Sequence, residues 1–176
     1  MSRHDSVRTR LEAGERQRLD DLLTKSSRTF ALTIPLLPEP TRLEVTLAYL
    51  LFRVADTLED ATRWSTPRKL AELDAFAALV DSRDPMQASS LALQWGAEPP
   101  LDEPGYLELL GELPFVMRAT RTLAPDSWAI IARHTVRTTR GMATFVSRET
   151  DGPVHLRDLA DLRAYCYTVA GIVGEM

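Results

Sequence analysis

Apolar residues recur at helical spacing along most of the chain, and prolines separate one periodic stretch from the next. No stretch shows the strict alternation of apolar and polar residues that is typical of a half-buried strand. The periodicity predicts helices over residues 7–24, 41–60, 67–80, 103–113, 126–146 and 157–176, with a shorter one over 86–93 inside a connector at 84–104. The sequence therefore predicts an all-α fold, a bundle of helices with a cavity between them.

The stretch 41–60 is apolar on almost every side, which indicates a helix at the centre of the fold. Thr41 and Glu44 have the Thr-x-x-Glu spacing of a capping box, so we expect them to close its N-terminus. The other end carries three acidic residues, Asp56, Glu59 and Asp60. Because the C-terminal end of a helix is partially negative, each anion there costs about 0.3–1 kcal/mol unless a cation compensates it.

Spacings of three and four residues place these carboxylates on one face of the helix, with Asp56 and Asp60 about 6 Å apart along its axis. That arrangement suits Mg²⁺, which takes one or two carboxylates and keeps water and phosphate oxygens as its other ligands. Arg53, one turn earlier, could bind the same phosphate group or pair with Asp56. The alternative is an acidic helix end in solvent, which most short acidic motifs are.

Composition limits the classes of protein to consider. The chain has 176 residues, 44% of them hydrophobic, which is enough for one domain with a core over 1–176, and its net charge of −4 argues against a nucleic-acid partner. The single cysteine, Cys166, excludes a disulfide framework, fits a cytoplasmic protein and is expected to be a small core residue. The N-terminus does not resemble a signal peptide, and the longest apolar run, 45–52, is too short to span a bilayer, which leaves peripheral membrane contact open.

Two further segments combine charged and polar side chains. The run 26–30, Ser-Ser-Arg-Thr-Phe, could form a phosphate clamp with an apolar floor, or a helix cap followed by a core phenylalanine. Arg133, Arg137 and Arg140 form a stripe that we interpret as the solvated face of an amphipathic helix. His134 is expected to be a surface or capping residue.

Glycines occur inside the last two predicted helices, 126–146 and 157–176. Gly141 lies inside a helix, where glycine costs about 1 kcal/mol relative to alanine, so it needs a packing or ligand reason. Ala170, Gly171 and Gly174 recur at helical spacing after Tyr165. They leave room either for a neighbouring backbone or for a long apolar ligand.

Four stretches together resemble the squalene/phytoene synthase family of head-to-head prenyltransferases. They are Ser-Arg-Thr-Phe at 27–30, the stretch 49–60, Arg-Gly-Met-Ala at 140–143 with Phe145, and the stretch 165–174. They occur in the family's order and cover most of the chain from Lys25 onward. The acidic run Asp-Thr-Leu-Glu-Asp at 56–60 is more similar to the squalene synthase version than to the phytoene synthase version.

The resemblance implies an isoprenoid-synthase fold in which two farnesyl diphosphates condense in one central cavity by way of presqualene diphosphate. It implies Mg²⁺ held by acidic residues and, in squalene synthases, reduction by NADPH. The roles it implies are the following: Asp56, Glu59 and Asp60 bind metal; Arg28 and Arg53 bind diphosphate or the nucleotide; Phe30 and Gly141 contact substrate; Tyr165 acts near the reacting carbons; Val169, Gly171 and Val173 line an apolar channel.

The sequence departs from the family in one respect. The family has a second acidic motif on a later helix, and residues 165–176 contain no Asp-x-x-x-Asp pattern. We therefore expect the chain to be the N-terminal portion of a synthase domain, with little activity alone. The alternatives are a phytoene or dehydrosqualene synthase, and a non-catalytic half of a split enzyme whose partner chain carries the missing motif.

Overall fold

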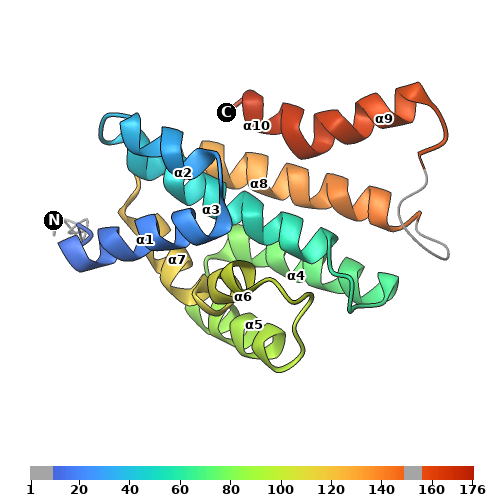
Figure 1. The fold of residues 1–176 in the computed structure, drawn as a ribbon, viewed down its shortest axis with the longest axis horizontal. Coiled ribbons are helices and arrows are strands. Elements are labelled where there is room, and N and C mark those ends of the chain that lie inside the picture. The colour runs from blue at the N-terminus through green and yellow to red at the C-terminus, as the bar shows by residue number, and fades with distance from the viewer. Residues whose placement is uncertain (1–9, 149–155) are drawn as a thin grey trace, which may run out of the picture.

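A computed structural model of the chain describes residues 10–148 and 156–176 (Figure 1). Its elements, in order, are α1 (Ala13–Ser26), α2 (Phe30–Thr33), η1 (Ile34–Leu36), α3 (Thr41–Glu59), α4 (Thr66–Ser82), α5 (Pro85–Ala97), α6 (Pro104–Gly111), α7 (Leu113–Ala119), η2 (Thr120–Thr122), α8 (Pro125–Val146), α9 (Leu159–Cys166), the π-helical turn η3 (Tyr167–Gly171) and α10 (Ile172–Gly174). The described residues contain no strand, and the predicted all-α class is confirmed. The expectation for the extreme N-terminus falls on residues 1–9, outside the described ranges.

Helix α3 is the centre of the fold, as its apolar surface predicts. It contacts α1, α4, α6, α7 and α8, and five of its aliphatic side chains are completely buried: Leu47, Leu50, Leu51, Val54 and Leu58. Each such side chain contributes about 1.5–3 kcal/mol through burial. The helix is therefore a rigid support for the acidic residues at its C-terminal end.

The predicted capping box is wrong. Thr41 is the first helical residue rather than the cap, and no side chain caps the helix at Pro40. The Glu44 carboxylate instead accepts a hydrogen bond of 2.5 Å from the Ser127 hydroxyl. This contact joins the starts of α3 and α8, so a tertiary contact replaces the expected local one.

The connector at 84–104 is more helical than predicted. Helix α5 extends to Ala97, and Asp84 caps its start by accepting a 2.9 Å hydrogen bond from the Met86 amide. Trp95 near its end is completely buried, and its indole Nε1 donates to Glu72 of α4 at 2.9 Å. This buried contact explains why the helix continues beyond residue 93.

The last segment runs along α8 and covers one side of it (Figure 1). Asp158 caps α9, in agreement with the predicted start, but the π turn η3 interrupts the predicted continuous helix. Two residue predictions are wrong: Cys166 is exposed, and His134 is buried with its Nδ1 2.8 Å from the Ile130 carbonyl oxygen. Across the described residues, no helix combines the length and the apolar character needed to cross a bilayer.

Candidate functional site

The acidic residues at the end of α3 lie in an environment that disfavours their charges. Burial raises the pKa of Asp56 to about 6, although the nearby Arg53 opposes this shift. Burial, together with the charges of Asp60 and Asp56, raises the pKa of Glu59 to about 7. Burial also raises the pKa of Asp60, against the opposing charges of Lys69 and Arg53. Carboxylates arranged in this way are stabilised by an added cation.

Glu59 adds an independent indication. Its side chain is only 7% exposed, and within the described parts of the chain its buried Oε1 has no hydrogen-bond partner. An orphaned buried carboxylate oxygen is costly unless an ion or water satisfies it. Within residues 10–148 and 156–176, however, no three His, Cys, Asp or Glu side chains are placed to hold a metal ion by themselves. The residues therefore fit a Mg²⁺ whose remaining ligands are water and phosphate oxygens.

Tyr165 reaches this acidic cluster from the last segment of the chain. Its phenol lies close enough to Glu59 to be affected by the charge of that carboxylate, and its ring meets the Phe145 ring edge-on at 5.2 Å between centroids. Burial and the charge of Glu59 raise the pKa of the Tyr165 phenol above its ordinary value, so the phenol stays protonated and can donate. The structure thus brings together two predicted site residues from distant parts of the chain.

Arg53 connects the acidic cluster to a group of aromatic residues. Its Nη1 lies 3.5 Å from Oδ2 of Asp56, and its Nη2 donates to the Tyr49 hydroxyl at 3.0 Å. The Tyr49 hydroxyl in turn donates to the Ser26 carbonyl at 3.0 Å. The Arg53 guanidinium also lies over the Tyr106 ring, 5.1 Å from its centroid. These contacts hold the guanidinium in a defined place beside Asp56.

Arg53 also lines a pocket of about 440 Å³ that contains the run 26–30. The pocket residues are Thr24, Lys25, Ser26, Ser27, Arg28, Thr29, Phe30, Arg53, Glu103 and Tyr106. Ser27 caps the short α2 by accepting a 2.9 Å hydrogen bond from the Phe30 amide. Phe30 is not a core residue: it is 53% exposed and packs on Tyr49 with ring centroids 5.3 Å apart. The pocket therefore offers two guanidinium groups, hydroxyls and an aromatic floor.

Gly141 has a packing reason. A Cβ atom at this position would lie 2.4 Å from Cγ2 of Thr168, so α8 and the last segment approach each other too closely for a larger residue. Val169 and Val173 are half-buried and pack against the core. Substrate contacts for Gly141 and the channel role of Val169, Gly171 and Val173 stay predictions.

Sequence reasoning missed three residues that contribute to the site: Tyr49 and Tyr106 as partners of Arg53, and Lys69 as a positive charge near Asp60. The contact of Tyr49 with Arg53 could have been predicted from the sequence, because Tyr49 lies four residues before Arg53 on the same helix face. The positions of Tyr106 and Lys69 could not have been predicted, since both residues lie on other helices.

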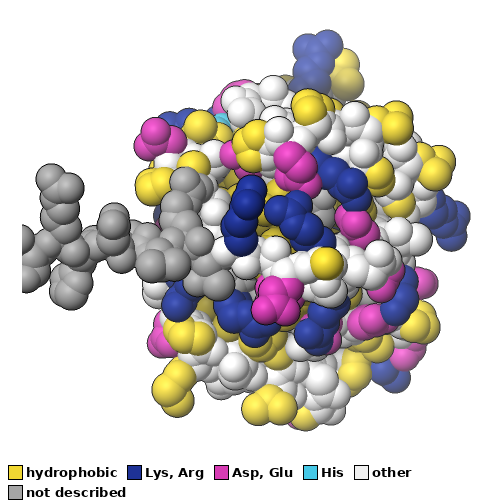
Figure 2. Space-filling model, turned by 90° about the vertical axis from the view of Figure 1, so that its left-hand side faces the viewer, with side chains coloured by type: hydrophobic (Ala, Val, Ile, Leu, Met, Phe, Trp, Pro, Cys, Tyr) yellow, Lys and Arg dark blue, Asp and Glu magenta, His cyan; other side chains and the backbone are white. Residues whose placement is uncertain are grey.

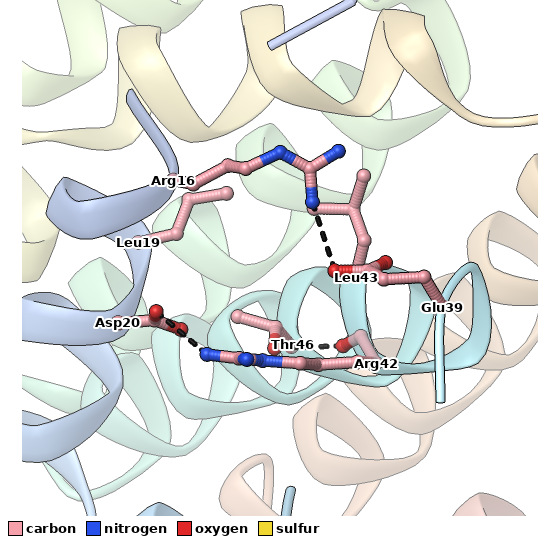
Figure 3. Close-up of a pocket in the computed structure, with 7 residues that line it drawn as sticks. All are labelled: Arg16, Leu19, Asp20, Glu39, Arg42, Leu43 and Thr46. Carbon is pink, nitrogen blue, oxygen red and sulfur yellow. Dashed lines mark hydrogen bonds and ion pairs between the residues drawn. The ribbon is translucent and has the colours of Figure 1, made fainter. Parts of the chain in front are cut away.

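A smaller pocket provides a contrast. It lies between α1 and the start of α3, has a volume of about 90 Å³, and contains the ion pairs Arg16–Glu39, at 2.8 Å, and Arg42–Asp20, at 2.7 Å (Figure 3). Figure 2 shows the face that lies on the left of Figure 1, where basic and acidic side chains are interspersed. Every charged side chain that lines this small pocket is thus paired, whereas Arg28 in the larger one has no ion pair among the described residues.

Comparisons with known proteins show which family and fold this chain shares. The family model described as squalene/phytoene synthase matches residues 23–176. A squalene synthase of Botryococcus braunii is 33% identical over 154 residues, which are 88% of this chain and 30% of the relative. A squalene synthase of Yarrowia lipolytica is 30% identical over 171 residues, which are 93% of this chain and 35% of the relative.

A solved structure shows the same similarity in three dimensions. The complex of TcSQS with the ligand BPH1237 superposes with a TM-score of 0.74 and 28% identity, over 92% of this chain and 42% of that one. The chain thus spans about a third of the length of the curated relatives named above. Given a family match over residues 23–176 and a shared fold, the chain belongs to the squalene/phytoene synthase family.

Proposed function

We propose that this chain forms the first half of the active site of a squalene synthase-like prenyltransferase, which condenses two farnesyl diphosphates head-to-head by way of presqualene diphosphate. The observation that carries the proposal is the position of Arg53, between the pocket that contains Arg28 and the carboxylate of Asp56. A diphosphate bound by the two arginines would have its oxygens next to the acidic cluster. Guanidinium groups recognise phosphate through paired hydrogen bonds.

We infer that Asp56, Glu59 and Asp60 would hold Mg²⁺ together with water and diphosphate oxygens, because their raised pKa values and the orphaned Glu59 oxygen favour a cation. When bound, it would neutralise the charge of the departing diphosphate. The protein's own residues would orient the diphosphate through Arg28 and Arg53 and exclude water with the rings of Phe30 and Tyr106. Use of NADPH for the final reduction is part of the proposal and rests on similarity to squalene synthases.

We propose that Tyr165 holds a proton near the reacting carbons. Its phenol stays protonated because burial and the charge of Glu59 raise its pKa, and it lies near the acidic cluster. It would donate a hydrogen bond to a developing anion or move a proton at that oxygen. The apolar ring of Phe145 beside it would shield a carbocation from water.

One acidic cluster is not sufficient for this chemistry, because the described residues contain no set of three ligands for a metal. We propose that a second acidic motif completes the site, from residues beyond these 176 or from a partner chain. We also propose a reducing, cytoplasmic location, with which a single free cysteine is compatible, and peripheral membrane contact that delivers the prenyl substrates.

The test is an incubation with farnesyl diphosphate, Mg²⁺ and NADPH. We compare the 176-residue chain with the same chain joined to a relative's segment that carries the second acidic motif. The joined protein should form presqualene diphosphate and squalene, and Asp56→Ala should abolish the release of diphosphate. Asp74→Ala, an exposed carboxylate on α4, is the matched control and should keep full turnover.

Four results would contradict the proposal or redirect it. A joined, folded protein that forms neither product rules it out, and full turnover by Asp56→Ala refutes the metal assignment. A hydrocarbon product without NADPH favours the phytoene or dehydrosqualene synthase alternative. A stable complex with a native chain that carries the second motif favours the split enzyme, whereas a persistent monomer argues against it.

A further inference from the structure

The last helical segment contains a π turn, η3, that begins two residues after Tyr165. A π turn inserts one extra residue into a helix and rotates the side chains that precede it relative to those that follow. Such turns are rare and are frequent at functional sites. In this chain the side chains on the two sides of the turn have different partners.

The turn is held against α8 by the glycine contact, defined here as Gly141 and Thr168. A Cβ atom on Gly141 would lie 2.4 Å from Thr168 Cγ2, and the Thr168 hydroxyl donates to the Ala164 carbonyl at 2.9 Å. That hydrogen bond holds the threonine methyl toward Gly141. The distance between the two helices at this point therefore depends on the absence of a side chain at residue 141.

A second group holds the ends of the turn, and we call Arg137, Tyr167 and Glu175 the terminal clamp. The Arg137 Nη1 lies 2.6 Å from Glu175 Oε2, and its Nη2 donates to the Tyr167 hydroxyl at 2.5 Å. The Tyr167 hydroxyl also donates to Glu175, and the guanidinium lies over the Tyr167 ring. A single arginine of α8 thus holds a residue at the first position of η3 and another one beyond α10.

Tyr165, before the turn, has different neighbours from Tyr167. Its ring packs on Phe145 of α8 with centroids 5.2 Å apart, and in this position its phenol lies near Glu59 of α3. A hydroxyl that acts on a substrate must lie within hydrogen-bond reach, and a displacement of about 1 Å can cost 100-fold in rate. The position of the turn on α8 consequently decides whether Tyr165 can serve the acidic cluster.

We propose that the glycine contact and the terminal clamp are positioning devices for Tyr165. They fix the register of η3 on α8 and thereby hold the Tyr165 ring on Phe145, with its hydroxyl near Glu59. The catalytic use of Tyr165 rests on the proposed function, but the positioning itself is a property of this chain and can be measured without turnover.

The experiment uses ¹⁹F NMR of the 176-residue chain labelled with 3-fluorotyrosine. The chain has four tyrosines, so four resonances are expected, and single Tyr→Phe variants assign them. Gly141→Ala should move the Tyr165 resonance by more than its linewidth, because the added Cβ displaces the turn. Thr168→Ser in the Gly141→Ala background removes the clashing methyl, keeps the hydroxyl and should return the resonance to its wild-type position.

Gly174→Ala is the matched control, since a Cβ there would meet nothing within 4 Å, and it should leave the Tyr165 resonance in place. Arg137→Met is a second test that does not disturb the core, because Arg137 is exposed. Loss of the clamp should broaden or shift the Tyr165 resonance even if Gly141→Ala fails to fold. The proposal is overturned if Tyr165 is unmoved in folded Gly141→Ala or in Arg137→Met, or if Thr168→Ser does not restore it.

Failure of the positioning and failure of the proposed function give different results. If the resonance behaves as expected but the joined protein makes no product, the positioning stands and the prenyltransferase function is wrong. If the joined protein is active and Gly141→Ala lowers kcat without moving Tyr165, the positioning is wrong and the function stands.

Discussion

Glu59 lies in surroundings that strongly disfavour its charge. It is buried beside two further acids and near Tyr165, and its Oε1 has no hydrogen-bond partner within the described residues. Without a cation, its charge destabilises the folded state, because burial and like charges both favour the neutral form. The ionised carboxyl group of Glu59 therefore lowers the free energy of unfolding of the chain when no cation is bound.

This arrangement predicts how stability depends on pH. The pKa of Glu59 is about 7 in the folded chain against 4.5 ordinarily, so the folded state holds the proton more tightly. Its contribution to the free energy of unfolding falls as pH rises from about 4.5 to above 7. Glu59→Gln should therefore stabilise the chain at pH 8 by about 2–3 kcal/mol and have little effect below pH 4.5.

Urea unfolding of the wild type and of Glu59→Gln at several pH values, without divalent metal, measures this difference. Asp74→Asn, at an exposed position on α4, is the control and should not change the pH dependence. If the free energy of unfolding falls equally in the wild type and in Glu59→Gln between pH 5 and 8, ionisation of Glu59 does not destabilise the chain and the prediction is wrong.

Arg53 leads to a second prediction at this scale. Arg53→Lys should weaken binding of Mg²⁺–diphosphate about 10-fold or more, since a lysine cannot satisfy Tyr49 and Asp56 together as the planar guanidinium does. Titration calorimetry with inorganic diphosphate and Mg²⁺ measures the affinity. Arg63→Lys, at an exposed arginine paired with Asp102 at 2.9 Å, should bind as the wild type does, and equal affinity for the two variants would refute the role of Arg53.

The positions of individual site residues were predicted correctly where the residues lie close together in the sequence. The spacing of Asp56, Glu59 and Asp60 was sufficient to place them on one helix end, and the proximity of Arg53 to Asp56 follows from their separation of three residues. The contact of Tyr165 with Glu59 could not be read in this way, because it joins distant parts of the chain through helix packing. His134 and Cys166 were misplaced for the same reason: burial of a single polar or small residue is decided by which helix lies opposite.

Helices were predicted best where the apolar periodicity and a proline at the helix start agree, as in α8 between Pro125 and Val146. They were predicted worst where tertiary contacts determine the length of the helix. Helix α5 extends beyond the predicted end because Trp95 is buried against Glu72, and η3 interrupts a helix whose sequence pattern is continuous. Periodicity reports which face of a helix is apolar, but it does not report the partner that fixes its length.

The packing of α6 on α1 provides a test at the scale of elements. A Cβ atom on Gly105 would lie 2.4 Å from the Lys25 carbonyl oxygen, and this contact sets Tyr106 beside Arg53. Gly105→Ala should destabilise the chain by about 1–3 kcal/mol, since backbone must move to admit the methyl group. It should also weaken diphosphate binding, because Tyr106 and Lys25 both line the pocket.

Gly111→Ala, in the same helix but with nothing within 4 Å of its Cβ position, is the control. It should leave diphosphate binding unchanged and keep or raise the thermal midpoint, since alanine favours helix more than glycine does. If Gly105→Ala and Gly111→Ala have the same midpoint and the same affinity, α6 does not depend on close approach to α1.

At the scale of the whole molecule, the proposed site joins a rigid part to a weakly held one. Helix α3 is surrounded by other helices, whereas the segment 156–176 makes its main contacts with α8 alone. Two leucines of α9, Leu159 and Leu162, are 60% and 42% exposed. The acidic cluster therefore belongs to the stable core, and Tyr165 belongs to a segment with few buried residues.

That division predicts two classes of amide hydrogen exchange. Exchange is slow where burial is deep, and few buried contacts allow local opening at low free energy. Amides of α9, η3 and α10 should therefore exchange well before those of α3, and Mg²⁺ with diphosphate should slow the terminal segment if the ligand draws Tyr165 and Glu59 together. Arg137→Met should accelerate exchange in that segment and leave α3 unchanged, because it removes the clamp without touching the core. Mass spectrometry of the exchanging chain resolves the two regions, and terminal amides as protected as those of α3 would show that the segment 156–176 is an integral part of the core.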